Sequence, residues 1–206
     1  MHFPRENGVK GFRAAVDGLA SAVLREVSQG TSVIILSDVD ADHERPPIPS
    51  LIALRAVVRA LNESGLRLQT SIVMHSAEAR TPHHIATLIG FGASAVCPYL
   101  GLEIARNDED DSFHRLPVEV RERNYVNALE LGLLKTMSKC GISVVQSYMS
   151  AKLFTAIGLG SELMENFFPG KPTPLGGIGY EELATDILWK TGLASLPEYQ
   201  NKLLNT

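Results

Sequence analysis

The chain has 206 residues, of which 45% are hydrophobic and 20% are charged. This composition excludes a disordered chain, and the length is enough for one domain with a substantial core. Its 19 basic and 23 acidic residues leave a net charge of −4, which excludes a strongly basic nucleic-acid binder. No apolar run approaches the ~20 residues of a membrane span, and the first residues lack the apolar core of a signal peptide. We therefore expect one cytoplasmic domain over residues 1–206.

The two cysteines, Cys97 and Cys140, are far apart in the sequence and form no CxxC pair. We expect both thiols to be reduced, as in an intracellular protein. An iron–sulfur cluster takes about four protein ligands, so two thiols cannot hold one alone.

Apolar residues recur at helical spacing in several segments of the chain. In the clearest segment, Ser50 is placed to cap the start of the helix and Gly65 to end it. A second helix begins with Thr81 as its N-cap and Pro82 as its first residue. In chain order, the predicted helices span residues 11–29, 50–64, 82–90, 100–105, 121–139, 150–157, 161–168 and 180–191.

Short runs rich in β-branched residues predict four strands between these helices, at residues 31–38, 69–74, 93–96 and 142–146. Residues 168–179, which are rich in proline and glycine, are predicted to form an irregular loop. Because helices alternate with strands, the sheet is expected to be mostly parallel.

The predicted fold is therefore α/β, with a mostly parallel sheet of about four strands and flanking helices. Four strands are half of what a closed βα-barrel needs, so we expect a rudimentary or partial barrel-like domain. Its core spans about residues 31–192, after the N-terminal helix at 11–29 and before a C-terminal tail at 193–206.

Acidic residues crowd the end of the first predicted strand, in the sequence SDVDADHE at residues 37–44. A strand that ends in DxD resembles the nucleophile motif of haloacid-dehalogenase-type phosphatases, which bind Mg²⁺. The rest of that motif is missing, and so are the glycine and glutamate that an EF-hand loop requires. We interpret the segment as a polar loop. A Mg²⁺ site at Asp38, Asp40 and Asp42 is the alternative.

A second polar cluster, MHSAEARTPHH at residues 74–84, follows the second predicted strand. Its ionisable residues are His75, Glu78, Arg80, His83 and His84. Binding sites of parallel α/β sheets form at the carboxyl ends of the strands, so a pocket is expected here. His83 and His84 point about 100° apart on a helix, which does not suit a zinc pair. We predict a hydrogen-bonded network or an interface.

Five stretches together resemble the central domain of the glutamate synthase large chain. In the order of that family they read LSD (36–38), IPSLIALRAVVRALNESGLR (48–67), EARTPHHIATLIGFGASAVCPYL (78–100), NYVNALELGLLKTMSKCGISVVQSY (124–148) and GGIGYEELA (176–184). Five blocks at consistent spacing are far more specific than any single motif in the chain.

The resemblance implies a non-catalytic domain that joins a glutaminase domain to an FMN-binding barrel, of which it is a rudimentary relative. It implies no cofactor in this chain, because the family's FMN and iron–sulfur cluster belong to other domains. The domain would hold the two modules in register and help to wall the path of ammonia between them. The candidate interface or pocket residues are Asp38, His75, Glu78, Arg80, His83, His84, Asn124, Tyr125, Ser147 and Tyr148.

The chain departs from the family at two arginines. The family's SYRGA reads SYMSA at residues 147–151, and the arginine that precedes its GGIG turn is missing from residues 173–175. Arginines at such positions contribute anion contacts or domain docking.

Two functions of other classes remain open: a stand-alone Mg²⁺-dependent phosphatase, and a stand-alone binder of a small ligand at the loops after the second and fourth strands. The expected partners are glutaminase and FMN-binding domains, with a homo-oligomer as the alternative. No nucleic acid and no membrane is expected as a partner. A connector buries two surfaces in its assembly, so we expect an exposed apolar face.

Overall fold

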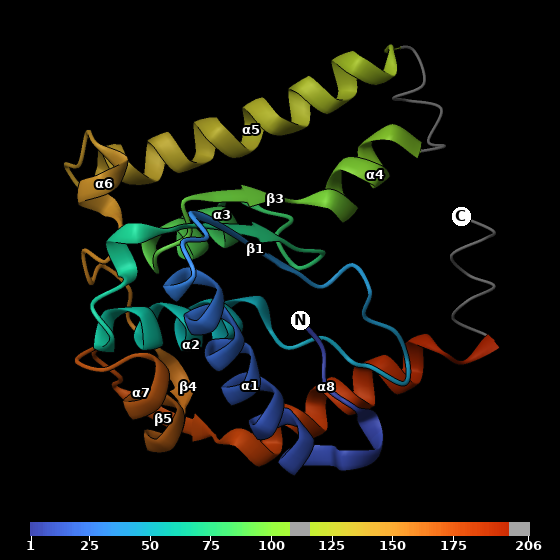
Figure 1. Cartoon of the computed structure of the whole chain (residues 1–206). Coiled ribbons are helices and arrows are strands. Elements are labelled where there is room, and N and C mark those ends of the chain that lie inside the picture. The colour runs from blue at the N-terminus through green and yellow to red at the C-terminus, as the bar shows by residue number, and fades with distance from the viewer. Residues whose placement is uncertain (108–115, 198–206) are drawn as a thin grey trace.

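The computed structural model describes residues 1–107 and 116–197 (Figure 1). Its helices are α1 (Gly8–Ser28), α2 (Ser50–Glu63), α3 (Pro82–Gly90), α4 (Tyr99–Asn107), α5 (Val118–Lys139), α6 (Val145–Tyr148), α7 (Ser161–Phe167) and α8 (Tyr180–Ala194). Its strands are β1 (Val33–Ser37), β2 (Ser71–His75), β3 (Ala95–Cys97), β4 (Ile157–Leu159) and β5 (Leu175–Ile178). Most of the predicted C-terminal tail, residues 198–206, lies outside the described residues. None of the helices in the described ranges is long and apolar enough to cross a membrane.

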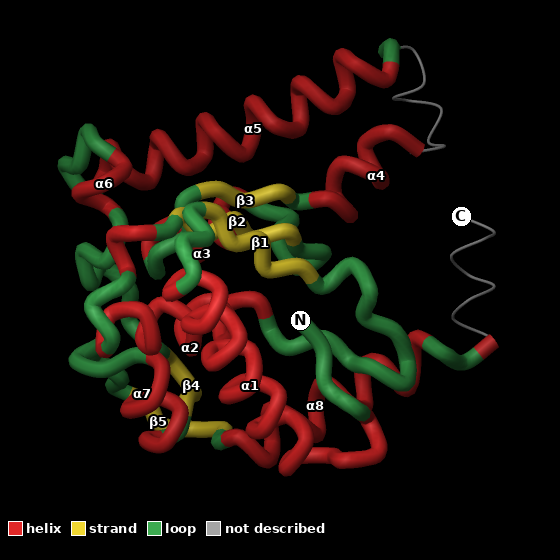
Figure 2. Tube along the Cα trace, in the orientation of Figure 1, coloured by secondary structure: helices red, strands yellow, loops and turns green. Residues whose placement is uncertain are grey.

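The strands form two small parallel sheets, which Figure 2 shows as separate yellow groups. The larger sheet has the order β1-β2-β3, and α2 and α3 connect its strands in turn. In the smaller sheet β4 pairs with β5. The α/β class, the parallel strands and the flanking helices are confirmed. Successive βα units build an open sheet here, as predicted for a partial barrel.

The predicted fourth strand at residues 142–146 is wrong. The backbone amides of Ser147 and Tyr148 donate to the carbonyl of Val144, at 3.0 and 3.2 Å, and form the helical turn α6. A β-branched run becomes a strand only where a neighbouring strand completes its hydrogen bonds. The described residues provide no such neighbour at this point of the chain.

The predictions for residues 150–157 and 168–179 also need correction. Ser150 and Lys152 have φ angles of +63° and +57°, which an α-helix cannot contain, so the chain is irregular up to the start of β4. Within the predicted loop, β5 pairs with β4. A Cβ at Gly177 would lie 2.2 Å from the backbone oxygen of Gly158, so this pairing requires glycine.

One face of the larger sheet is buried and the other is open. Ile34 and Leu36 of β1 are buried, as are Ile72 and Met74 of β2. These side chains pack into the core with α1, α2 and α3. On the opposite face, Ile35 is 64% exposed. Parallel sheets are usually covered on both faces, so this open face is unusual for the class.

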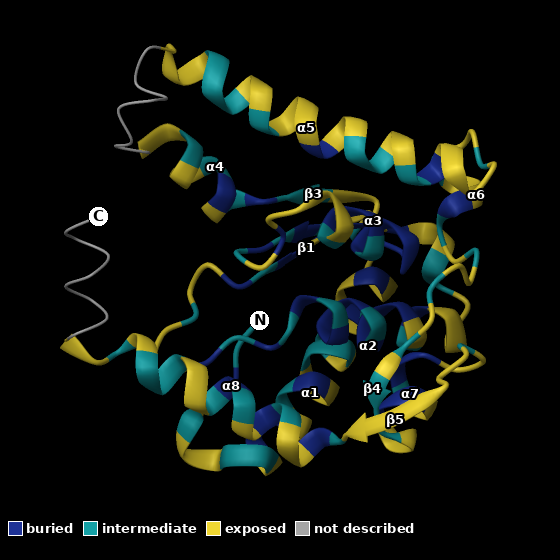
Figure 3. Ribbon diagram, turned by 180° about the vertical axis from the view of Figure 1, so that it is seen from behind, coloured by how far each residue is buried: buried dark blue, intermediate teal, exposed yellow. Residues whose placement is uncertain are grey.

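Helix α5 lies on the outside of the domain, and Figure 3 shows that most of its length is exposed. Of its residues, only Leu129 and Met137 are buried. Two glycines hold it close to its neighbours. A Cβ at Gly132 would lie 2.4 Å from Pro82, and a Cβ at Gly101 of α4 would lie 2.1 Å from the Tyr125 hydroxyl. Small residues at these two crossings therefore set the position of α5.

Replacing Gly132 with alanine tests this packing. Alanine in a helix interior ordinarily stabilises by about 1 kcal/mol relative to glycine. Here the added methyl group meets the rigid Pro82 ring, and such overpacking costs about 1–3 kcal/mol. We expect Gly132→Ala to lower the free energy of unfolding by about 1 kcal/mol in urea denaturation.

Gly18→Ala is the matched control, because a Cβ at Gly18 of α1 meets no atom within 4 Å. It should be neutral or stabilising by up to about 1 kcal/mol. Equal effects of the two substitutions would contradict the close crossing of α5 over α3.

Candidate functional site

A buried carboxylate organises the carboxyl edge of the larger sheet. Asp38, at the end of β1, is only 4% exposed. The Ser76 hydroxyl donates to its Oδ2 at 2.9 Å, and the Ala77 amide donates to both oxygens at 3.1 and 3.2 Å. Burial, together with a hydrogen bond to Asp38, raises the pKa of Tyr99 at the start of α4. A buried charge is tolerated where donors satisfy it, and here three residues supply them.

The same network reaches the start of α2. The hydroxyls of Ser50 and Ser76 lie 2.5 Å apart, and the Glu78 amide donates to the Ser76 hydroxyl. The Ser50 amide donates to Glu78 Oε2 at 2.7 Å. The predicted capping role of Ser50 is therefore wrong, because Ser50 is the first residue of α2 and the Glu78 carboxylate takes the cap position. A carboxylate there also interacts favourably with the helix dipole.

His75 ties the ends of two strands together. Its Nδ1 lies 2.7 Å from the Ser37 hydroxyl, and its ring stacks on Tyr99 at a centroid distance of 4.5 Å. Beside Asp38 and Tyr99 a pocket of about 360 Å³ opens, which the loop after β1 and the end of α8 also line. Of the predicted site residues, Asp38 and Glu78 line this pocket.

The second polar cluster closes the loop before α3. The predicted N-cap is confirmed, since the His84 amide donates to the Thr81 hydroxyl. The Arg80 amide donates to His84 Nδ1 at 3.2 Å, and the Tyr125 hydroxyl donates to the Arg80 carbonyl at 3.2 Å. His83 is exposed and lines a shallow pocket with Arg80 and Glu78. These contacts form a polar network that fastens α5 to the loop.

Three of the candidate residues lie apart from this network. Asn124 is exposed on α5, and Ser147 is exposed on α6. Tyr148 is buried at 1% exposure, where its ring packs 6.3 Å from that of Phe154. Figure 1 places α6 at the end of the sheet opposite to α4. Because the predicted fourth strand does not form, Ser147 and Tyr148 do not lie at the carboxyl edge of the sheet.

Three network members were not among the predicted residues: Ser50, Ser76 and Tyr99. Ser76 could have been found, because it follows β2 as Asp38 follows β1, and the two strands pair in register with Ser37 opposite His75. The roles of Ser50 and Tyr99 depend on tertiary contacts.

The three aspartates at residues 38, 40 and 42 lie in different surroundings. Asp42 accepts hydrogen bonds from the Arg45 amide and guanidinium at 2.7 and 2.8 Å, and these bonds lower its pKa. Asp38 is engaged by the buried network, while Asp40 is exposed. Across residues 1–107 and 116–197, no three metal-ligating side chains converge. The Mg²⁺ alternative therefore lacks a cluster of carboxylates.

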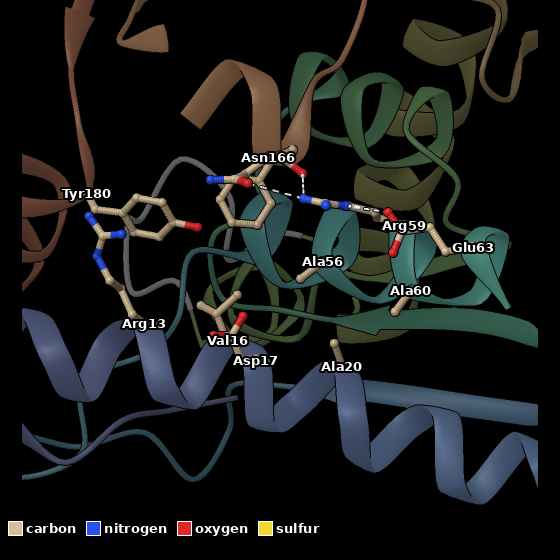
Figure 4. Close-up of a pocket in the computed structure, with 11 residues that line it drawn as sticks. Arg13, Val16, Asp17, Ala20, Ala56, Arg59, Ala60, Glu63, Asn166 and Tyr180 are labelled. Atoms are coloured by element: carbon tan, nitrogen blue, oxygen red, sulfur yellow. Dashed lines mark hydrogen bonds and ion pairs between the residues drawn. The ribbon is translucent and has the colours of Figure 1, made fainter. Parts of the chain in front are cut away.

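A separate groove of about 410 Å³ runs between α1, α2, α7 and α8 (Figure 4). Arg13 lies over the Tyr180 ring at 4.1 Å and is paired with Glu162. Arg59 is paired with Glu63 and donates to Asn166. The two arginines of this groove are thus neutralised within the domain.

Removing the hydroxyl of Ser76 tests the buried network. Ser76→Ala takes one donor from the Asp38 carboxylate and one acceptor from the Glu78 amide, so we expect a loss of about 1–3 kcal/mol in the free energy of unfolding. Ser71→Ala is the control, because Ser71 begins the strand that Ser76 follows and is exposed. It should change stability by less than about 0.5 kcal/mol. Equal effects would show that the network contributes nothing specific.

The raised pKa of Tyr99 predicts that the stability of the fold decreases at alkaline pH. The folded state holds the phenolic proton more tightly than the unfolded chain does. The contribution of this phenol to the free energy of unfolding is therefore complete below pH ~10 and is lost as the pH rises further. In an ultraviolet absorbance titration, Tyr99→Phe should lack one late-titrating phenol. A difference curve centred at the ordinary tyrosine pKa would contradict the contact with Asp38.

The chain shares its fold with a flavoenzyme of known structure. A flavocytochrome b2 variant with sulfite bound superposes with a TM-score of 0.50 at 16% identity, over 75% of this chain and 39% of that chain. That protein is TIM-barrel-like, which agrees with the partial barrel described above.

Sequence comparisons define the family. The family model of the glutamate synthase central domain matches residues 1–160. Ferredoxin-dependent glutamate synthase 2 of Synechocystis is 35% identical over 97% of this chain, and the NADPH-dependent large chain of Bacillus subtilis is 38% identical over 79%. The chain spans only 14% and 11% of the lengths of these relatives. The chain belongs to the glutamate synthase central domain family.

Proposed function

We propose that the chain is the connector of a glutamate synthase, which holds a glutaminase module and an FMN-binding module in register for ammonia assimilation. In this proposal the flavin and the iron–sulfur cluster belong to the other modules, and the assembly works in the cytoplasm. The relatives support a role as one part of a larger enzyme, because this chain corresponds to a small share of each.

The open face of the larger sheet is the observation that carries the proposal. In register across this face lie Ile35, Val73 and Ala95, with Val33 beside Ile35 at the start of β1. Ile35 and Val33 are 64% and 53% exposed. A parallel sheet is normally covered on both faces, so an apolar row of this kind is suited to contact with a neighbouring module.

The buried network supports a structural role for the carboxyl edge. Both oxygens of Asp38 and the hydroxyl of Ser76 are occupied by partners within the domain. A general base or nucleophile must reach its substrate, whereas these groups fix the ends of β1 and β2 against α2 and α4. The edge therefore serves as a rigid frame for the surfaces around it.

Placing a charge on the open face tests the connector. We expect Ile35→Glu to weaken assembly of the chain with the glutaminase and FMN-binding portions of the same organism's enzyme by at least tenfold, because the carboxylate would be buried without a partner. Sedimentation velocity of the mixed components measures the assembly, and thermal unfolding of the variant checks that the domain still folds.

Leu68→Glu is the matched control, because Leu68 is 99% exposed and lies outside the sheet, on the turn Arg67–Gln69. It should assemble like the unmodified chain. Failure of the unmodified chain to bind either module would count against the proposal. If Ile35→Glu instead splits a homo-oligomer of this chain, the open face joins copies of the domain.

A further inference from the structure

Another pocket, beside α2, is lined by three cations. Its volume is about 460 Å³, within the ~300–1,000 Å³ of small-molecule sites. The basic residues are Arg55 of α2, Lys152 of the segment before β4, and Lys171 of the segment before β5. Ser150 and Asn62 add polar groups to the lining. We call this site the basic pocket.

The three cations line one pocket, and none of the described carboxylates lines it with them. Arg55 and Lys171 both lie over the Phe91 ring, at 5.7 and 5.0 Å from its centre. Burial, followed by the charges of Arg55 and Lys152, lowers the pKa of Lys171. No acidic residue lines the pocket, and none of the three cations forms an ion pair with any carboxylate in the described ranges.

The arginines in the groove of Figure 4 have partners of another kind. There, each arginine is paired with a glutamate of the domain itself. In the basic pocket, Arg55 instead donates Nε to the Phe167 carbonyl at 2.7 Å and Nη1 to the Phe91 carbonyl at 3.4 Å. Carbonyl groups fix the guanidinium in place but leave its charge uncompensated. Like charges gathered in this way are unfavourable unless an anion joins them.

The backbone is strained at two residues that line the pocket, and one of them is the cation Lys152. Lys152 has φ +57° and Ser150 has φ +63°, a region that ordinarily favours glycine. Gly170 faces Lys152 at close range, since a Cβ there would lie 3.3 Å from the lysine Nζ. A lysine at a position where glycine would be more stable points to a use for its ammonium group.

The wall of the basic pocket is aromatic and borders an apolar cavity. Phe91, Phe168 and Lys171 line both the basic pocket and a neighbouring cavity of about 180 Å³. Phe154 and Leu159 add apolar surface to that cavity. A ligand with an anionic group and an attached apolar group would match the two compartments together.

From this arrangement we propose that the basic pocket binds a small organic anion, with its phosphate or carboxylate group held by Arg55, Lys152 and Lys171 and its apolar group against Phe91 and Phe168. The site is independent of the connector role, because it lies outside both the open sheet face and the Asp38 network.

Isothermal titration calorimetry of the chain with phenyl phosphate tests the proposal. We expect one site per chain, with tighter binding than for inorganic phosphate because the ring adds contacts with Phe91 and Phe168. Lys152→Gln and Lys171→Gln should each weaken binding about tenfold or more, the loss of one charge-assisted hydrogen bond. Benzoate, titrated in parallel, shows whether a carboxylate replaces the phosphate.

Lys135→Gln is the control, because it removes the same charge from an exposed position on α5. It should change affinity by less than about twofold, since distant surface charges are screened. Equal weakening by all three glutamine variants would reduce the binding to general attraction and overturn the site, as would the absence of binding by phenyl phosphate and benzoate.

Lys152→Gly separates binding from folding. It relieves the left-handed backbone at residue 152, so we expect a melting temperature at or above that of the unmodified chain. The affinity for phenyl phosphate should nonetheless fall about tenfold or more, as for Lys152→Gln. Unchanged affinity in this variant would show that the lysine is not a ligand and would overturn the proposal.

Discussion

The arrangement of the domain depends on one buried carboxylate and the donors that satisfy it. Asp38 sits at the end of β1, and Ser76 and Ala77 at the end of β2 donate to it. Through Ser50 and Glu78, the same hydrogen bonds fix the start of α2. A buried charge is costly unless fully hydrogen-bonded, so its partners must hold their positions. This requirement makes the carboxyl edge of the sheet a rigid frame.

The rest of the domain divides into surfaces that are complete and surfaces that are not. The groove between α1 and α2 pairs its arginines with the domain's own glutamates. The open face of the sheet leaves Ile35 exposed, and the basic pocket leaves Arg55, Lys152 and Lys171 without carboxylates in the part of the chain described. An exposed apolar row and an uncompensated group of charges are stabilised by different kinds of partner. The first favours an apolar partner, and the second favours an anion.

The comparison of this partial barrel with a closed βα-barrel explains why one face of the sheet is open. In a closed barrel, the inward face of each strand is covered by the strands opposite. Among the described residues, the larger sheet has three strands and a separate sheet has two, so the inward row of β1, which holds Ile35, meets no opposite strand there. Helix α5, which crosses α3 and α4 at Gly132 and Gly101, leaves this same row of β1 uncovered, with Ile35 64% exposed. A neighbouring module is a natural cover for such a face.

The sequence by itself determined the α/β class, the first three strands, most of the helices and the family, because local periodicity and caps such as Thr81 act over a few residues. It also placed Asp38 and His75 at one edge, since parallel strands share their direction. Only the tertiary structure decided that residues 145–148 form a helix, that Glu78 caps α2, and that Lys152 and Lys171 line one pocket with Arg55. Strand pairing and charge clusters depend on neighbours distant in sequence, and local patterns carry no record of them.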